Sequence, residues 1–281
     1  MKLLRAIGRG IAALLGVGFV AAAYLYLTLP DVRPLRAGTP STTAFMQLRA
    51  EQAHARGLPE KRDWQWVPYA RISANLKRAV IVTEDGAFWQ HDGMDYEQLR
   101  DAVETNLERG EFVRGASTIT QQLAKNLYLS PSKNPIRKVK EILITRRLEV
   151  ELSKQRILEL YLNSIEWGDG VWGAEAAARR YFHKPAAELT ATESALLAGA
   201  IANPHIMDPA RPSARLRRRQ QMIMRRMGAV TPPPVLAEPS PAPVPDTPLI
   251  PALPTVPLSS QPLPGAPVTS PSGRGSGGNL P

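Results

Sequence analysis

Residues 79–95 read AVIVTEDGAFWQHDGMD, and the rest of the chain is best understood outward from this stretch. An apolar run ends at two adjacent carboxylates, Glu84 and Asp85, and aromatic residues follow them. A carboxylate at the end of an apolar run and beside aromatic rings loses solvation, which raises its pKa and suits a residue that transfers protons. For an isolated acidic pair, solvated acids at a helix end are the simpler interpretation. Segments elsewhere in the chain decide between the two.

Composition and charge limit the classes of function. The chain has 281 residues, no cysteine and a net charge of +10. Without cysteine there is no disulfide framework and no thiolate chemistry, and we predict no metal site. Residues 1–30 carry +3 and residues 231–281 carry −1, so +8 lies on residues 31–230. A basic folded region indicates an anionic partner such as nucleic acid, anionic lipid or a phosphorylated substrate.

The N-terminus narrows this choice of partner. Residues 11–29, IAALLGVGFVAAAYLYLTL, contain no charged residue. Nineteen helical residues rise about 28 Å, close to the roughly 30 Å hydrocarbon core of a bilayer. Lys2, Arg5 and Arg9 precede the run, which predicts a cytoplasmic N-terminus and an exported remainder. An exported domain argues against nucleic acid as a partner.

A cleaved signal peptide is the alternative interpretation of the same run. The run is longer than a usual signal-peptide apolar region, and residues 30–33, PDVR, lack the small residues of a cleavage site. We therefore expect a retained, single-pass anchor, with the following domain exported across the membrane.

The body of the chain reads as mainly α. Serines at 73 and 153 are typical N-caps, Gly110 is a helix stop, and Pro135 suits a first helical turn. Alternating β-branched runs are few, residues 167–170 form a turn, and residues 45–56 are too mixed to assign. Helices are predicted over 74–83, 96–109, 117–129, 135–152, 154–163, 173–182, 191–202 and 211–227.

The predicted organisation has four parts. Residues 1–30 are the cytoplasmic end and transmembrane helix, 31–63 an exported stem, 64–230 the main folded domain, and 231–281 a tail. Sixteen of the 27 prolines lie in that tail, which predicts disorder with polyproline II character. The basic helix over 211–227 has two interpretations, a solvated face or a contact with anionic lipid headgroups.

The second informative segment is residues 114–129, RGASTITQQLAKNLYL. On a helix, Thr118, Gln122 and Lys125 share one face, while Ile119 and Leu123 belong to an apolar stripe. A solvated polar face is the alternative, but amides and hydroxyls stand where Glu/Lys pairs are usual. Such groups suit a sugar and a phosphate.

The third segment is residues 137–149, RKVKEILITRRLE. Arg137 and Lys138 precede Glu141 by four and three residues, so all three can share one helical face. The segment fits either a surface salt-bridge ladder or a carboxylate held among cations near a pyrophosphate, and by itself does not distinguish them.

These segments together carry a resemblance. EDGAFWQHDGMD resembles the E-D-x-x-F-x-x-H-x-G-x-D signature of glycosyltransferase family 51, the peptidoglycan glycosyltransferases. Residues 114–129 resemble the second motif of that family, RKVKE the third, and KQRILELYLNSIEWGDGVWGAEAAARRYF the fourth and fifth. The resemblance covers about Trp66 to Pro209. Since the K-T-G motif of a transpeptidase domain is missing, and the S-x-x-K match at residues 130–133 lies inside the range of the resemblance, it points to the monofunctional biosynthetic members of the family.

The resemblance implies a mainly α, lysozyme-like glycosyltransferase domain with a lobe that enters the outer leaflet. It implies polymerisation of lipid II into β-1,4 glycan strands, by inversion at the donor sugar, with release of undecaprenyl pyrophosphate. No cofactor is required with certainty, and a divalent cation, Mg or Mn, is a candidate at the donor pyrophosphate. The implied partners are lipid II, the growing lipid-linked glycan and inner-membrane phospholipid, with cell-wall or division proteins as further candidates.

The resemblance also implies a role for each matching residue. Glu84 matches the catalytic base, and Glu141 the second acidic residue, which helps to hold the donor pyrophosphate. The matching phosphate-binding cations are Arg114, Lys125, Arg137 and Lys138. The matching polar substrate-binding residues are Ser117, Thr118, Gln122 and Asn126. Structural support of the first motif is expected from Asp85, Phe88 and His91.

Two other functions fit parts of the same pattern. A lysozyme-like muramidase also uses two carboxylates on an α-rich fold, but it needs a water site and not a pyrophosphate site. A non-catalytic cell-wall scaffold could recruit partners through the Pro-rich tail, although the intact motif positions argue against it.

Overall fold

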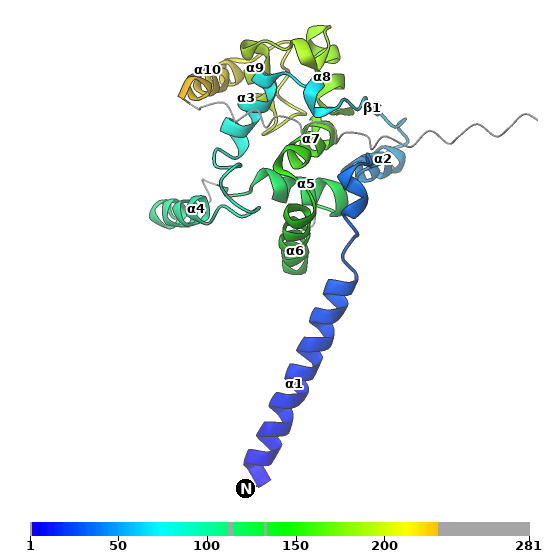
Figure 1. Cartoon of the computed structure of the whole chain (residues 1–281), viewed down its shortest axis with the longest axis vertical. Coiled ribbons are helices and arrows are strands. Elements are labelled where there is room, and N and C mark those ends of the chain that lie inside the picture. The colour runs from blue at the N-terminus through cyan, green and yellow to red at the C-terminus, as the bar shows by residue number, and fades with distance from the viewer. Residues whose placement is uncertain (1, 112–114, 132–133, 230–281) are drawn as a thin grey trace, which may run out of the picture. The chain divides into compact units, whose positions relative to one another are not determined.

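The computed structural model describes residues 2–111, 115–131 and 134–229, and the mainly α prediction is confirmed (Figure 1). The helices are α1 (Lys2–Leu27), α2 (Ala44–Ala55), α3 (Ala74–Glu84), α4 (Tyr96–Arg109), α5 (Ile119–Tyr128), α6 (Pro135–Glu151), α7 (Lys154–Ser164), α8 (Ala174–Phe182), α9 (Ala191–Ala200) and α10 (Ala214–Ala229). Short 3-10 turns cover Arg33–Arg36, Tyr69–Arg71 and Ala186–Glu188.

Three very short strands form a small sheet that the sequence did not predict. β1 (Asp63–Trp64) pairs in parallel with β3 (Val171–Trp172), which pairs antiparallel with β2 (Glu166–Gly168). The turn expected at residues 167–170 therefore joins β2 and β3. The sheet ties the end of the stem to a hairpin more than 100 residues later.

Helix α1 has the properties expected of the anchor. Ile7–Leu27 is long and apolar enough to cross a membrane, with a mean hydropathy of 2.0, and none of that window is buried within the fold. An apolar helix of this length without protein around it is consistent with a membrane anchor.

The starts of the helices follow from their capping residues. Ser73 accepts a hydrogen bond from Leu76 N–H, and Ser153 accepts one from Arg156 N–H, as expected of N-caps. Thr118 caps α5, which therefore begins at Ile119 and not at residue 117. Helix α2, unassigned from the sequence, begins behind the cap Thr43.

The core of the domain is formed where α3, α5, α7 and α9 bury their apolar faces. Helix α3 packs against α9 and α10, and α5 packs against α6 and α7. The largest fully buried side chains include Trp167, Trp172, Tyr161 and Phe88. This core fixes the C-terminal end of α3, with Glu84, beside the start of α5. The predicted tail at 231–281 lies outside the described residues.

Candidate active site

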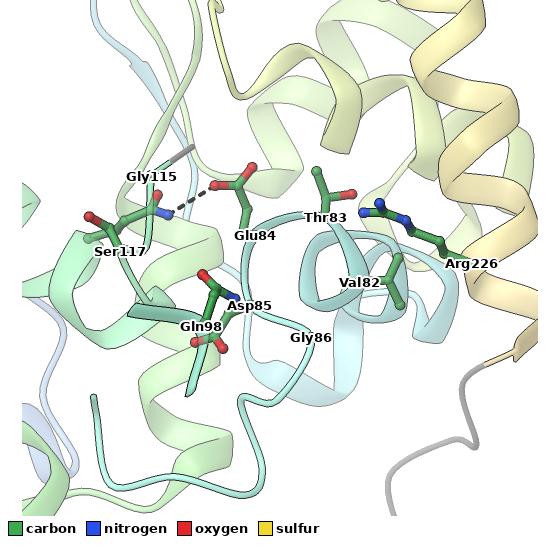
Figure 2. Close-up of a pocket in the computed structure, with 10 residues that line it drawn as sticks. Val82, Thr83, Glu84, Asp85, Gly86, Gln98, Gly115, Ser117 and Arg226 are labelled. Carbon is green, nitrogen blue, oxygen red and sulfur yellow. Dashed lines mark hydrogen bonds between the residues drawn. The ribbon is translucent and has the colours of Figure 1, made fainter. Parts of the chain in front are cut away.

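Glu84 is the last residue of α3, and its side chain points into a cavity of about 800 Å³ (Figure 2). Leu76, Val80 and Ile81 bury the preceding turns of the helix, so the position of Glu84 is set by the core. Residues from α3, the loop after it, α4, the segment before α5, α5 and α10 line this cavity: Val82, Thr83, Glu84, Asp85, Gly86, Gln98, Gly115, Ser117, Gln122 and Arg226.

A hydrogen bond from a neutral amide holds the Glu84 carboxylate. The Gln122 amide Nε2 donates to Glu84 Oε2 at 2.9 Å, the contact dashed in Figure 2. The hydroxyl of buried Tyr161 lies 2.8 Å from Gln122 Oε1 and donates to it. Since a carboxylate only accepts, this tyrosine donor fixes the amide with its NH₂ group toward Glu84.

Burial raises the pKa of Glu84 above its ordinary value. The Gln122 hydrogen bond and the nearby cations Arg219 and Lys125 oppose this shift, while Asp85 adds to it. A carboxylate with a raised pKa is a better proton acceptor than a solvated one. The expectation drawn from its apolar, aromatic surroundings is therefore confirmed in direction.

Asp85 differs from its neighbour because other residues occupy both of its oxygens. Oδ2 accepts from Ile119 N–H at 2.9 Å, and Oδ1 lies 2.9 Å from His91 Nε2. Gly93 N–H donates to His91 Nδ1, so the ring proton is on Nε2 and is donated to Asp85. Asp85 and His91 thus join the end of α3 to the start of α5, which supports their expected structural role.

Glu141 lies in a second, smaller cavity of about 110 Å³. Its carboxylate is buried and forms ion pairs with Arg137, at 2.8 Å, and with Lys138. The residues that line this cavity are Ser117, Gln121, Gln122, Lys125, Arg137, Lys138 and Glu141. Ser117 and Gln122 line both cavities, so the two adjoin.

Burial lowers the pKa of Lys125, and Arg137 and Lys138 lower it further, while Glu141 and Glu84 act in the opposite direction. Its ammonium is therefore partly desolvated and lies among two cations and two carboxylates. An arriving anion such as phosphate would favour the charged form of Lys125, because it compensates the positive charge of the three cations.

Thr118 and Asn126, two residues predicted to bind substrate, form hydrogen bonds within the fold and do not line the cavities. The Thr118 hydroxyl accepts from Gln121 N–H and donates to Gly93 O at 2.8 Å, so it is used at the start of α5. Asn126 is buried and donates to Gln122 O at 2.8 Å. Neither is among the residues that line the two cavities. Arg114 lies outside the described residues.

Phe88 is fully buried and supports the loop after α3. Its ring packs edge-on against Trp89 at 5.0 Å between centroids, and the Lys154 ammonium lies 4.6 Å from the ring centroid. These contacts join the first motif to the start of α7.

Helix α10 contributes residues that the sequence did not assign to the site. Arg226 lines the larger cavity and points from α10 toward Thr83 in Figure 2. Arg219, two turns earlier on the helix, lowers the pKa of Glu84 through its positive charge, against the larger effect of burial. The stretch interpreted only as a basic helix thus forms part of the cavity wall. The sequence signal for this position was the row of apolar residues on α10, Leu216, Ile223 and Met227, which are buried and pack the helix against the domain.

One cluster has the composition of a metal site but not its chemistry. Within the described residues, ligand-type atoms of Asp85, His91 and Asp95 lie within 4.8 Å of one another. The hydrogen bonds above already engage both oxygens of Asp85 and both ring nitrogens of His91. Asp95 caps α4 by accepting from Gln98 N–H at 2.8 Å. We therefore assign this cluster to the structure of the loop.

Comparison with known proteins places this arrangement in a family. The family model described as Transglycosylase matches residues 51–228, more than half of the chain. The chain belongs to the transglycosylase family. The matched range of this family member includes both carboxylates and the part of α10 that lines the larger cavity.

Curated relatives agree with that membership. Biosynthetic peptidoglycan transglycosylase of Laribacter hongkongensis (strain HLHK9) is 45% identical over 229 residues, 81% of this chain and 99% of the relative. The relative of that name from Nitrosomonas eutropha is 51% identical over 188 residues, 67% of this chain and 77% of its own. The relative from Neisseria gonorrhoeae is 44% identical over 219 residues, which cover 78% of this chain and 93% of the relative.

Proposed function

We propose that this transglycosylase family member polymerises lipid II into peptidoglycan glycan strands. The relatives are named as biosynthetic peptidoglycan transglycosylases, which supports glycan polymerisation in cell-wall synthesis. The observation that carries the proposal is the adjoining pair of cavities, one around the proton acceptor Glu84 and one around the cations that surround Glu141.

The larger cavity suits the acceptor sugar. With a hydroxyl of that sugar beside Glu84, the carboxylate takes the hydroxyl proton as the oxygen forms its bond to the anomeric carbon of the donor. The bond from that carbon to the pyrophosphate oxygen breaks, and its electron pair leaves with the pyrophosphate. Attack from the face opposite the leaving group inverts an α-linked donor to a β-linked product.

The smaller cavity suits the pyrophosphate. Lys125, Arg137 and Lys138 are the cations that would stabilise the negative charge that develops on the leaving group. Glu141 orients two of them through its ion pairs. Ser117 borders both cavities, so it would lie between the acceptor sugar and the pyrophosphate.

A divalent cation is not needed for this arrangement. Both oxygens of Glu141 pair with cationic side chains, and a resident metal would have to displace them. A Mg or Mn ion that takes part would therefore arrive with the pyrophosphate, and the proposed mechanism routes no step through it.

The apolar helix α1 brings the site to a lipid-linked substrate. The charge bias of Lys2, Arg5 and Arg9 supports a cytoplasmic N-terminus, a single pass and a periplasmic domain in a bacterial inner membrane. We further propose that the chain acts as a glycosyltransferase alone, because the match covers 99% of the Laribacter hongkongensis relative, and that its substrates exclude nucleic acid.

The test is incubation of the full chain with lipid II and, separately, with finished glycan. We expect lipid II to be consumed and glycan chains to appear on a denaturing gel, with finished glycan left intact. Cleavage of glycan without polymerisation of lipid II would overturn the proposal in favour of a muramidase. No change in either substrate would favour a non-catalytic scaffold.

A further inference from the structure

A third cavity lies where α1 passes into the stem, away from the two cavities of the candidate active site. Its volume is about 550 Å³. Tyr26 and Leu29, at the end of α1 and just after it, line one part. Arg146, Arg147 and Val150 of α6 line another.

Arg147 holds this junction together. Its guanidinium donates to the carbonyl oxygens of Tyr26, at 3.0 Å, and of Leu29 and Pro30, both at 3.3 Å. It also lies 4.6 Å from the centroid of the Tyr26 ring. The last carbonyls of a helix lack partners within the helix, and a cation there is favourable. The cavity is therefore fixed at the C-terminal end of α1.

The length of α1 sets the depth of this cavity in a membrane. The apolar window is Ile7–Leu27, and tyrosines at its end favour the interface between hydrocarbon and water. A cavity that begins at Tyr26 and continues past Leu29 lies at the level of lipid headgroups. Phosphate is the group that a bilayer presents at that level.

The charges of the cavity suit phosphate. Asp31 pairs with Arg33 at 2.9 Å, and Glu151 pairs with Arg36. These pairs compensate both acids of the cavity wall. Arg146 is exposed and, within the described residues, has no carboxylate partner. Together with Arg147, it leaves the cavity positively charged.

An apolar face of α6 continues from the cavity. Ile136, Val139 and Val150 are 57%, 47% and 80% exposed, and Leu143, between them, lines the cavity. Their spacing of three, four and seven residues puts them on one side of the helix. Exposed apolar side chains in one row mark a contact surface, and beside a membrane they suit acyl chains.

We propose that this cavity binds the phosphate headgroup of an anionic phospholipid, whose acyl chains lie along Ile136, Val139 and Val150. The proposal goes beyond the transglycosylase activity and depends only on α1 spanning the membrane. It assigns Arg146 as the residue that binds the headgroup and Arg147 as the residue that positions the cavity.

The test measures lipid retention by native mass spectrometry on the full chain in detergent, titrated with phosphatidylglycerol. We expect Arg146→Gln to weaken affinity about fivefold, the contribution of one basic residue near an anionic surface. Arg146→Lys should stay within about twofold, since charge is kept. The matched control is Arg215→Gln, an exposed arginine of α10, which should bind like the wild type.

Several outcomes would overturn the proposal. Arg146→Gln binding as tightly as the wild type would, and so would an equal loss for Arg215→Gln, which would move the lipid contact to α10. Equal retention of phosphatidylcholine would remove the role of charge. Inorganic phosphate displacing the lipid at equal concentration would show a phosphate site without lipid selectivity. None of these readings requires a catalytically active protein, so failure of the proposed function remains distinguishable.

Discussion

The two carboxylates of the site, Glu84 and Glu141, stand in opposite surroundings although both lie on helices that pack into the same core. Glu84 is held by an amide, and no described residue forms an ion pair with it. Glu141 is the more buried of the two, yet two cations pair with it directly. The difference teaches that the partner, and not burial alone, decides what a carboxylate does. In the proposed function, Glu84 accepts a proton and Glu141 organises positive charge.

The largest effect should come from removing the first carboxylate. We expect Glu84→Gln to lower polymerisation about 10³-fold, within the range that a general base contributes. The melting temperature should be unchanged or higher, because a buried amide does not carry the cost of an ionised buried carboxylate. Glycan formation from lipid II and thermal unfolding measure the two.

The matched control for that change is Glu188→Gln, an exposed glutamate on the turn Ala186–Glu188. It should polymerise like the wild type. Retention of more than a tenth of wild-type activity in Glu84→Gln would assign the base to another group.

The next effect tests the cationic side of the comparison. Lys125→Gln removes a charge that faces the leaving group in the proposed function, and we expect about a 10²-fold loss in kcat, as for loss of one preorganised donor. The loss should fall on kcat more than on KM, because the charge develops in the transition state. Steady-state kinetics with lipid II measure this split, and a loss confined to KM would contradict the assignment.

The scaffold common to both carboxylates depends on a glycine. Gly93 has a φ of +85°, and an added Cβ would lie 2.7 Å from Thr145 Cγ2 and 2.9 Å from Glu149 Cγ. We expect Gly93→Ala to destabilise the fold by about 2 kcal/mol, in the usual range for strain at such a backbone position. Chemical denaturation measures the loss, with Gly86→Ala, at an open position, as the control.

The smallest effect tests the role of Gln122, the neutral hydrogen-bond partner of Glu84. The Gln122 hydrogen bond favours ionised Glu84, so Gln122→Leu should raise the pKa of Glu84 further. The acid limb of the kcat/KM profile should move to higher pH, because the carboxylate must be ionised to accept a proton. Tyr161→Phe should move the limb in the same direction by less, because the amide stays in place. The pH dependence of kcat/KM with lipid II measures both, and movement to lower pH in either variant would contradict this role.

Much of this arrangement could be predicted from the sequence because it depends on local signals. The cap Ser73 and the stop Gly110 set the bounds of α3 and α4 within a residue. The i, i+4 and i, i+3 spacing of Arg137 and Lys138 before Glu141 indicated the ion pairs. The apolar run before Glu84 indicated the direction in which its pKa is displaced.

What could not be predicted depends on contacts between distant segments. Tyr161, which orients Gln122, is 39 residues away in the chain. Arg226 reaches the cavity because α10 packs on α3. A basic run by itself does not indicate this contact, since it also fits a solvated helix face. Thr118 satisfied the spacing of a polar helix face, but its hydroxyl caps the helix instead, because a threonine at a helix start competes for the free N–H groups.

The bond from Ile119 N–H to buried Asp85 has a consequence for how the protein would fail on heating. It joins the end of α3 to the start of α5, so neither helix end can fray without leaving the buried Asp85 carboxylate without this hydrogen bond. The amide of Ile119 should therefore exchange its hydrogen with solvent only when the domain opens as a whole. Thermal inactivation and loss of helical signal would then follow one curve, with no inactive but folded state between them.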